Sequence, residues 1–292
     1  MNGWLCLDKP PGMSSNFAMI KVRKILGART GYVGTLDPFA TGVLPIAVGE
    51  ARKFIQFLGS SQRKKYDFTI VFGKTTDSLD RDGKITGESL KIPIPEEVKN
   101  ILPDFLGRQW QLPPIFSAIK IFGRRACDRV RAGENIELAA REVEIFFLSL
   151  EGVENNIFRF CVICSPGTYV RSLARDIAEK VGSLGYVDAL RRTESGFFSI
   201  KHAIPLENLS KIDDTDMLIR LLVPIESPLD DIPALYLEND LVKMVQNGLR
   251  ISLKNQLSLP CVRIHENFDG GFRGIGSVSD SGLLKAVRMC IY

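Results

Sequence analysis

The spacing of apolar and polar residues along the 292-residue chain predicts both strands and helices. Runs of aromatic and β-branched residues are typical of strands, and apolar residues repeated every three or four positions are typical of helices that bury one face. On this basis we expect strands over residues 3–8, 64–72, 141–150 and 157–164, and helices over 15–26, 51–58, 95–102 and 168–181. Both element types occur along the first two thirds of the chain, which predicts an α+β domain.

The residue pattern of the sequence changes after residue 223. Prolines at 224, 228 and 233 form a linker-like stretch, and the short strand-like runs that follow are separated by glycines. Asp269-Gly270 and Asp280-Ser281-Gly282 are typical of hairpin turns. We therefore expect two domains, 1–223 and 224–292, of which the second is a small β-barrel.

Composition is that of an ordinary globular protein, with 45% hydrophobic and 25% charged residues. The net charge of +4 is small, so any nucleic-acid site must come from a local patch. The densest positive cluster runs from Lys120 to Arg131 and contains five basic residues and one acid. Such a cluster can bind an RNA backbone by releasing counterions. A solvated helix face is an equally open alternative.

The cysteines and acidic residues give little sign of a metal site. Cys161-Val162-Ile163-Cys164 has the CxxC spacing, but in the predicted strand its two thiols would point to opposite faces, and the chain has no second such pair. The acids of residues 77–82 do not have the spacing of a calcium loop. We expect no metal and no cofactor.

The N-terminal residues lack the basic start and apolar run of a signal peptide, and no apolar run is long enough to span a membrane. Together with six scattered cysteines, this predicts a cytoplasmic protein with reduced thiols.

The stretch from Gly31 to Lys53 contains four glycines and two prolines, and Asp37 is the only acid between Asp8 and Glu50. Glycine and proline at this density fix a loop. A rigid, mainly apolar loop with one carboxylate is a suitable way to present a nucleophile or base. A simple turn opened by Asp37-Pro38 is the alternative.

This segment resembles the signature G-H-x-G-T-L-D-P-x-A-T-G-V-L of the bacterial tRNA pseudouridine-55 synthase family, TruB. The match covers Gly31, 34–38 and 40–44. The residues around Lys9 and the stretches 111–133 and 190–198 resemble further motifs of the family. The resemblance implies a pseudouridine synthase fold with a mixed, mainly antiparallel sheet flanked by helices. It also implies an RNA-gripping insertion at about 111–140 and a PUA-like C-terminal domain.

The resemblance also assigns roles. Asp37 would be the nucleophile, and Tyr66 would stack on the flipped base and take the final proton. Arg171 would pair with Asp37, which also suits its place in the first turn of a predicted helix, where the dipole disfavours a lone cation. The residues expected to bind substrate are Tyr32, Tyr169, Leu190, Lys9, Lys120, Arg124 and Arg125. Two positions depart from the family pattern: Tyr32 replaces a histidine and Cys127 replaces a tyrosine.

The expected function is isomerisation of the T-loop uridine at position 55 of tRNA to pseudouridine, by a monomer that flips the base out of the RNA. Asp37 would either attack the sugar or take its 2′ proton. A non-catalytic RNA-binding or tRNA-chaperone protein of the same fold is one alternative, which the two departures make conceivable. An unrelated hydrolase or phosphotransferase that uses Asp37 is the other.

Overall fold

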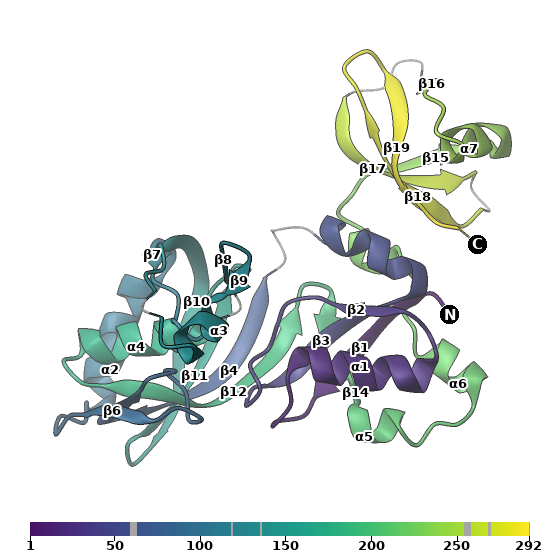
Figure 1. Cartoon of the computed structure of the whole chain (residues 1–292). Helices are drawn as coiled ribbons and strands as arrows, with labels where there is room; N and C mark the ends of the chain where they lie inside the picture. The colour runs from purple at the N-terminus through teal and green to yellow at the C-terminus, as the bar shows by residue number, and fades with distance from the viewer. Residues whose placement is uncertain (59–62, 118, 135, 254–257, 268–269, 292) are drawn as a thin grey trace.

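The computed structural model describes the chain except for residues 59–62, 118, 135, 254–257, 268–269 and 292. Figure 1 shows a large body built on one long curved sheet and a smaller unit at the C-terminal end of the chain. Within the described residues, no helix is long and apolar enough to cross a membrane.

Ten strands form the sheet of the large body: β1 (Gly3–Lys9), β2 (Thr30–Tyr32), β3 (Thr41–Val48), β4 (Lys64–Phe72), β7 (Gly107–Gln111), β10 (Arg141–Glu154), β11 (Ile157–Cys164), β12 (Gly185–Ser195), β13 (Phe198–Ser199) and β14 (Ile204–Pro205). Their order is β14-β1-β3-β12-β4-β11-β10-β7, with β2 beside β3 and β13 beside β12. The pairings β1–β14 and β3–β12 are parallel, whereas the central strands β12, β4, β11 and β10 pair antiparallel. The predicted mixed, mainly antiparallel sheet is therefore confirmed.

Helices accompany this sheet. The α-helices are α1 (Ser15–Leu26), α2 (Pro95–Ile101), α4 (Val170–Lys180), α5 (Leu206–Leu209) and α6 (Thr215–Arg220). The 3-10 helices are η1 (Gly49–Phe57), η2 (Leu102–Phe105), η3 (Ile200–His202) and η4 (Ser227–Leu229). The predicted ends of α1 are confirmed: the Ser14 side chain caps Phe17 N–H, and Gly27 ends the helix at φ +59°. The helix expected at 51–58 is η1, a 3-10 helix, and its expected end at Gly59 lies outside the described residues.

Two hairpin-containing segments of the large body lie outside the ten-stranded sheet. The hairpin of β5 (Lys74–Thr76) and β6 (Ile85–Glu88) carries the acidic turn. The insertion at 111–140 contains a small hairpin, β8 (Lys120–Ile121) with β9 (Arg124–Arg125), followed by α3 (Ala126–Arg131). The basic cluster is thus divided between a hairpin and a helix, and no single helix face carries it.

The C-terminal unit contains β15 (Ala234–Leu237), α7 (Asn239–Gln246), β16 (Ile251–Ser252), β17 (Leu259–Glu266), β18 (Phe272–Val278) and β19 (Leu283–Met289). Its strand order is β15-β17-β18-β19-β16, and the sheet curls into a half-barrel consistent with a PUA-like domain. The hairpin turn expected at 280–282 is present, with Gly282 at φ +74°, whereas Asp269 of the other expected turn lies outside the described residues. The boundary at residue 223 stays a prediction.

Cys161 and Cys164 are buried on β11, as expected for core residues, and their thiols are free. Burial raises the pKa of each thiol to about 11, so both are protonated at neutral pH.

An apolar cluster joins the two bodies. Phe54 on η1 is completely buried, and its ring contacts Phe272 on β18 edge-on, with ring centroids 5.2 Å apart. Trp4 belongs to the same cluster, and its indole N–H donates to Ile225 O in the connecting segment. The contact between the bodies is therefore dry, and it contributes to stability.

We predict that Phe54→Ala lowers the free energy of unfolding by about 3–5 kcal/mol, because it leaves a cavity between the two bodies. Urea denaturation measures the change. The matched control Phe17→Ala, whose ring is 51% exposed, should cost about 0.5 kcal/mol or less. Equal losses in the two variants would contradict this account of the contact.

Candidate active site

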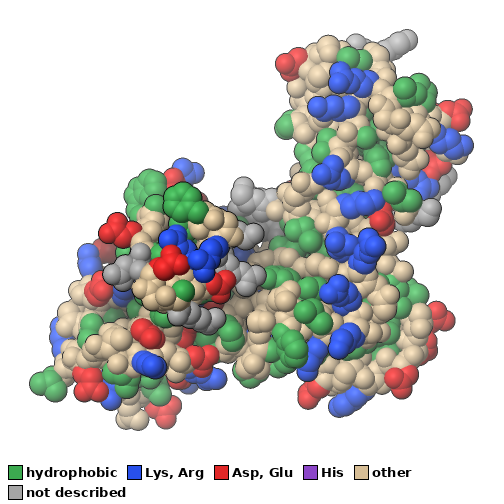
Figure 2. All heavy atoms as spheres, viewed as in Figure 1, with side chains coloured by type: hydrophobic (Ala, Val, Ile, Leu, Met, Phe, Trp, Pro, Cys, Tyr) green, Lys and Arg blue, Asp and Glu red, His purple; other side chains and the backbone are tan. Residues whose placement is uncertain are grey.

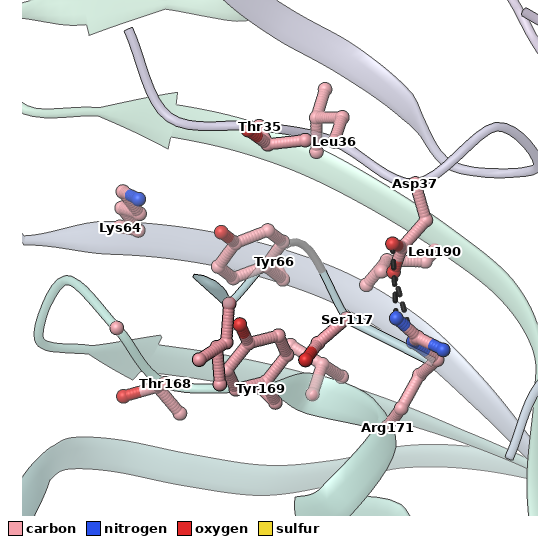
Figure 3. A pocket seen from close by; sticks show the side chains of 13 residues that line it. Thr35, Leu36, Asp37, Lys64, Tyr66, Ser117, Thr168, Tyr169, Arg171 and Leu190 are labelled. Carbon is pink, nitrogen blue, oxygen red and sulfur yellow. Dashed lines mark hydrogen bonds and ion pairs between the residues drawn. The ribbon is translucent and has the colours of Figure 1, made fainter. Parts of the chain in front are cut away.

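A cavity of about 290 Å³ opens between the Asp37 loop, β4, β12 and the start of α4. Figure 3 shows the side chains that converge on it. Five of the residues singled out from the sequence line this one cavity: Asp37, Tyr66, Tyr169, Arg171 and Leu190. They come from four separate segments of the chain, so the fold alone brings them together.

Arg171 and Asp37 form a two-point ion pair, drawn as dashed lines in Figure 3. Arg171 Nη2 donates to Asp37 Oδ1 at 3.0 Å, and Arg171 Nε lies 2.9 Å from Asp37 Oδ2. The Arg171 side chain is 4% exposed and that of Asp37 is 31% exposed. The planar guanidinium thus fixes the direction of the carboxylate from behind, while part of the carboxylate stays accessible from the cavity.

Arg171 also binds a second carboxylate that sequence reasoning missed. Its Nη1 lies 3.2 Å from Asp80 Oδ2 and donates to Ser78 O at 2.8 Å, and its Nη2 donates to Phe116 O at 2.9 Å. Asp80 is buried, and burial raises its pKa despite hydrogen bonds from Ser78 and from the N–H of Asp82. The sequence of this acid-rich turn argues against a calcium loop but gives no sign of a structural role, and in the structure Asp80 holds the arginine in place.

The loop that carries Asp37 is fixed by side chains from the first strand and helix. Lys9 Nζ donates to Pro10 O at 2.9 Å, Met13 O at 2.7 Å and Pro38 O at 3.2 Å. Ser15 Oγ both accepts from Leu36 N–H and donates to Leu36 O. Lys9 is completely buried by these contacts, and burial lowers its pKa to about 8. In the free protein Lys9 therefore holds the loop that carries Asp37, and its expected contact with substrate stays a prediction.

Tyr66 on β4 and Leu190 on the paired strand β12 both line the cavity; in the register Tyr66 lies opposite Arg192, and Leu190 lies opposite Phe68. Burial raises the pKa of the Tyr66 hydroxyl, so it is a neutral phenol at physiological pH. On the other side, Tyr169 precedes α4 and is fixed by Gln111, which accepts from the Tyr169 N–H at 2.8 Å and donates to its carbonyl at 3.1 Å. A flat ring could lie between these walls.

The remaining predicted residues lie outside this cavity. Tyr32 ends β2 and is half-buried against the main core. Arg124 is exposed on β9 and forms an ion pair with Glu134 at 3.2 Å. Lys120 and Arg125 pair through their backbones in the β8–β9 hairpin, and their side chains are beyond what the structure describes. The basic hairpin residues thus lie outside the cavity, although Ser117 and Ile119 of the same insertion line it.

The cavity also contains residues that sequence reasoning missed. Ser117 lines it, and its buried hydroxyl has no hydrogen-bond partner in the described part of the chain. Outside the cavity lining, two adjacent arginines at 191 and 192 have the sequence pattern of an ordinary surface pair. Arg191 does bind Asp8 at 2.8 Å, but Arg192 points to the opposite face and is completely buried. Alternation along a strand could have indicated that only one of the two faces solvent.

No group of three or more potential metal ligands occurs among the described residues.

The fold and the cavity together define the class of protein. Solved structures with the same fold include a Cbf5–Nop10–Gar1 complex, with a TM-score of 0.70 and 23% identity over 96% of this chain and 79% of that one. Another is an H/ACA RNP bound to a substrate RNA containing 2′-deoxyuridine, with a TM-score of 0.72 and 20% identity over 99% and 85% of the two chains. The fold is that of the pseudouridine synthases.

Sequence comparison is more specific. Residues 22–170 match the N-terminal domain of TruB family pseudouridylate synthase, and residues 171–230 match the tRNA pseudouridylate synthase B C-terminal domain. The tRNA pseudouridine synthase B of Zymomonas mobilis is 43% identical, over 86% of this chain and 84% of that protein. The Caulobacter vibrioides protein of the same name is 44% identical, over 99% and 93%. The chain therefore belongs to the TruB family of pseudouridylate synthases.

We predict that Asp80→Asn lowers kcat on the order of tenfold and leaves tRNA affinity unchanged, because Arg171 loses one of its two carboxylates and Asp37 must balance it alone. Single-turnover kinetics and a separate binding titration distinguish the two quantities. The control is Asp77→Asn in the same turn, whose carboxylate accepts from Lys84 N–H. A loss of tRNA affinity, or equal kcat losses in both variants, would contradict a positioning role for Asp80.

Proposed function

We propose that this chain converts the T-loop uridine at position 55 of tRNA to pseudouridine, with Asp37 as the catalytic carboxylate. Membership of the TruB family makes the chain a tRNA-modifying isomerase. The specific position, the T-arm as the bound element, the monomeric state and the cytoplasmic location are parts of this proposal. The observation that carries it is the ion pair of Asp37 with Arg171 in a cavity whose wall is the ring of Tyr66.

The reaction breaks the N1–C1′ bond of uridine, turns the uracil and joins its C5 to C1′. The proton lost from C5 is balanced by a proton gained at N1, so no redox change or external group is needed. Asp37 acts at the sugar, either by attack on C1′ or by removal of the 2′ proton. Because two contacts with Arg171 hold the carboxylate before the substrate arrives, little reorganisation is required during the reaction.

Tyr66 lines the cavity and offers its ring to the flipped base, and in Figure 3 its hydroxyl points away from Asp37, toward the side where Lys64 lies. Since its pKa is raised, the group that meets the C5 proton is a phenol and not a phenolate. We therefore assign Tyr66 a relay role, in which its hydroxyl oxygen accepts the C5 proton as its own proton passes on to N1 of the uracil, the atom that gains a proton in the reaction. Tyr169 and Leu190 complete the walls that hold the base.

Features of the surface suit an RNA substrate. Phe122, at the tip of the β8–β9 hairpin, is 98% exposed, and both turn residues, Phe122 and Gly123, have positive φ. An exposed ring beside basic residues can stack on an unpaired base. Figure 2 shows Lys and Arg side chains in a line from the part of the large body near α1 up to the C-terminal unit. These cations can contact phosphates of a folded RNA arm.

Family membership disfavours the alternative of a non-catalytic RNA-binding protein of the same fold, which rested on two departures from the family pattern: Tyr32 replaces a histidine and Cys127 replaces a tyrosine. Tyr32 is half-buried, and it does not belong to the cavity that contains Asp37. A substitution of Asp37 distinguishes the two candidates, since a binding protein does not need its carboxylate.

We predict that Asp37→Asn lowers turnover on the order of 10³-fold or more while tRNA affinity stays within about twofold, because the change removes the charge but keeps the shape. Tritium release from tRNA labelled at C5 of uridine measures turnover, and a gel shift measures affinity. The control is Asp67→Asn, which makes the same change at the residue that follows Tyr66 on β4. Retained turnover in Asp37→Asn would refute the catalytic role, and release from tRNA with cytidine at position 55 would refute the target position.

A further inference from the structure

The cavity has a cationic end that the proposed chemistry does not use. Lys64 and Tyr66 are two residues apart on β4, so both side chains project to the same face of the sheet, and both line the cavity. In Figure 3, Asp37 and Arg171 lie on one side of the Tyr66 ring and Lys64 lies on the other. A substrate that reaches Asp37 with its base against Tyr66 therefore also comes close to Lys64.

A second cation stands next to Lys64. The space in front of Gly34 is bordered by both: a Cβ at that position would lie 3.0 Å from Lys64 Nζ and 3.1 Å from Arg192 Nη1. Arg192 is completely buried and is held rigidly, because its Nε donates to Val43 O at 2.7 Å and its Nη2 to Gly34 O at 2.9 Å. Its Nη1 has no partner with full hydrogen-bond geometry among the residues that the structure describes, and the neutral hydroxyl of Tyr66, its neighbour across the strands, is a polar group that acts on this guanidinium.

Among the described residues, no carboxylate forms an ion pair with either cation at this end of the cavity. The charged or titratable groups that act on Lys64 are Arg192 on β12, which repels it, and the thiol of Cys164 on β11, which is protonated at neutral pH. Burial and the charge of Arg192 lower the pKa of Lys64 to about 8. Lys9, also buried, differs in that three carbonyls accept from it. Two close positive charges without an anion are unfavourable in the free protein, and a bound anion would relieve this.

We propose that Lys64, with Arg192 behind it, binds a phosphate group adjacent to the flipped uridine. The proposal rests on the proposed function, since the RNA backbone is the anion that necessarily accompanies a flipped nucleotide. Lys64 is half-buried and can reach the ligand, whereas Arg192 acts through its charge. At Gly34, φ +70°, even a Cβ would lie 3.0 and 3.1 Å from the nitrogens of the two cations, so Lys64 and Arg192 are held close together. A phosphate on the 5′ or the 3′ side of the uridine would lie in the cavity against Lys64, and the contact would hold the sugar near Asp37.

The test combines protein variants with RNA whose backbone charge is removed at one position. T-arm RNA is prepared with all phosphates intact, or with a neutral methylphosphonate on the 5′ or the 3′ side of the target uridine. The wild type, Lys64→Met and Lys65→Met are compared on each RNA. Lys65 is the matched control, because it carries the same charge on the opposite face of β4.

We expect one of the two methylphosphonates to lower kcat/KM of the wild type by about 10- to 100-fold, the range for a charged hydrogen bond. Lys64→Met should lose a similar factor on intact RNA and nothing further on that methylphosphonate RNA. Lys65→Met should keep the full sensitivity of the wild type. Lys64→Arg, which restores the charge, should recover most of the loss.

The proposal is overturned if both methylphosphonates cost Lys64→Met as much as they cost the wild type, because the cation and the phosphate would then act independently. It is also overturned if Lys64→Met lowers thermal stability, since removal of an unbalanced buried charge should leave stability equal or higher. Failure of the proposed function would look different: the wild type and Lys65→Met would both be inactive on intact T-arm RNA.

Discussion

One buried guanidinium organises the candidate active site. Arg171 connects the Asp37 loop, the turn that contains Ser78 and Asp80, and the carbonyl of Phe116 in the insertion. A charge removed from water must be balanced and hydrogen-bonded, so each of these segments is held at a fixed distance from the others. The constraint that keeps Arg171 buried therefore also shapes the cavity and aims the carboxylate of Asp37 into it.

Around this ion pair the protein places more positive charge than it neutralises. Lys9 donates hydrogen bonds to three backbone carbonyls in and around the Asp37 loop. Arg192 donates to the carbonyls of Gly34 and Val43, on either side of Asp37 in the sequence. Lys64 belongs to the same group, and no carboxylate in the described part of the chain forms an ion pair with it. Under the phosphate contact proposed above, the RNA strand supplies the missing anion, so structural support and substrate recognition would use the same type of residue.

Local sequence patterns predicted the elements well where a local cause exists. The strands 64–72 and 157–164 have the predicted bounds, and the caps of α1 are Ser14 and Gly27, because periodicity and capping are short-range effects. The pairing of Arg171 with Asp37 could also be anticipated, since a cation in the first turn of a helix requires a partner. What the sequence did not reveal depends on contacts between distant segments. The sequence around Asp80 does not indicate that it forms an ion pair with Arg171. The burial of Lys9 and Arg192 depends on the adjacent positions of β1, β3 and β12 in the sheet.

The most direct test of the central claim is the single-turnover rate of Arg171→Lys on tRNA, measured together with its affinity. Lysine keeps the positive charge but cannot bind both oxygens of Asp37 and the Asp80 carboxylate from one planar group. The account predicts a rate loss on the order of 10²-fold, or about 2.7 kcal/mol, with tRNA affinity unchanged. A rate close to that of the wild type would show that charge alone is sufficient, and it would contradict the claim that the geometry of the guanidinium positions the catalytic carboxylate.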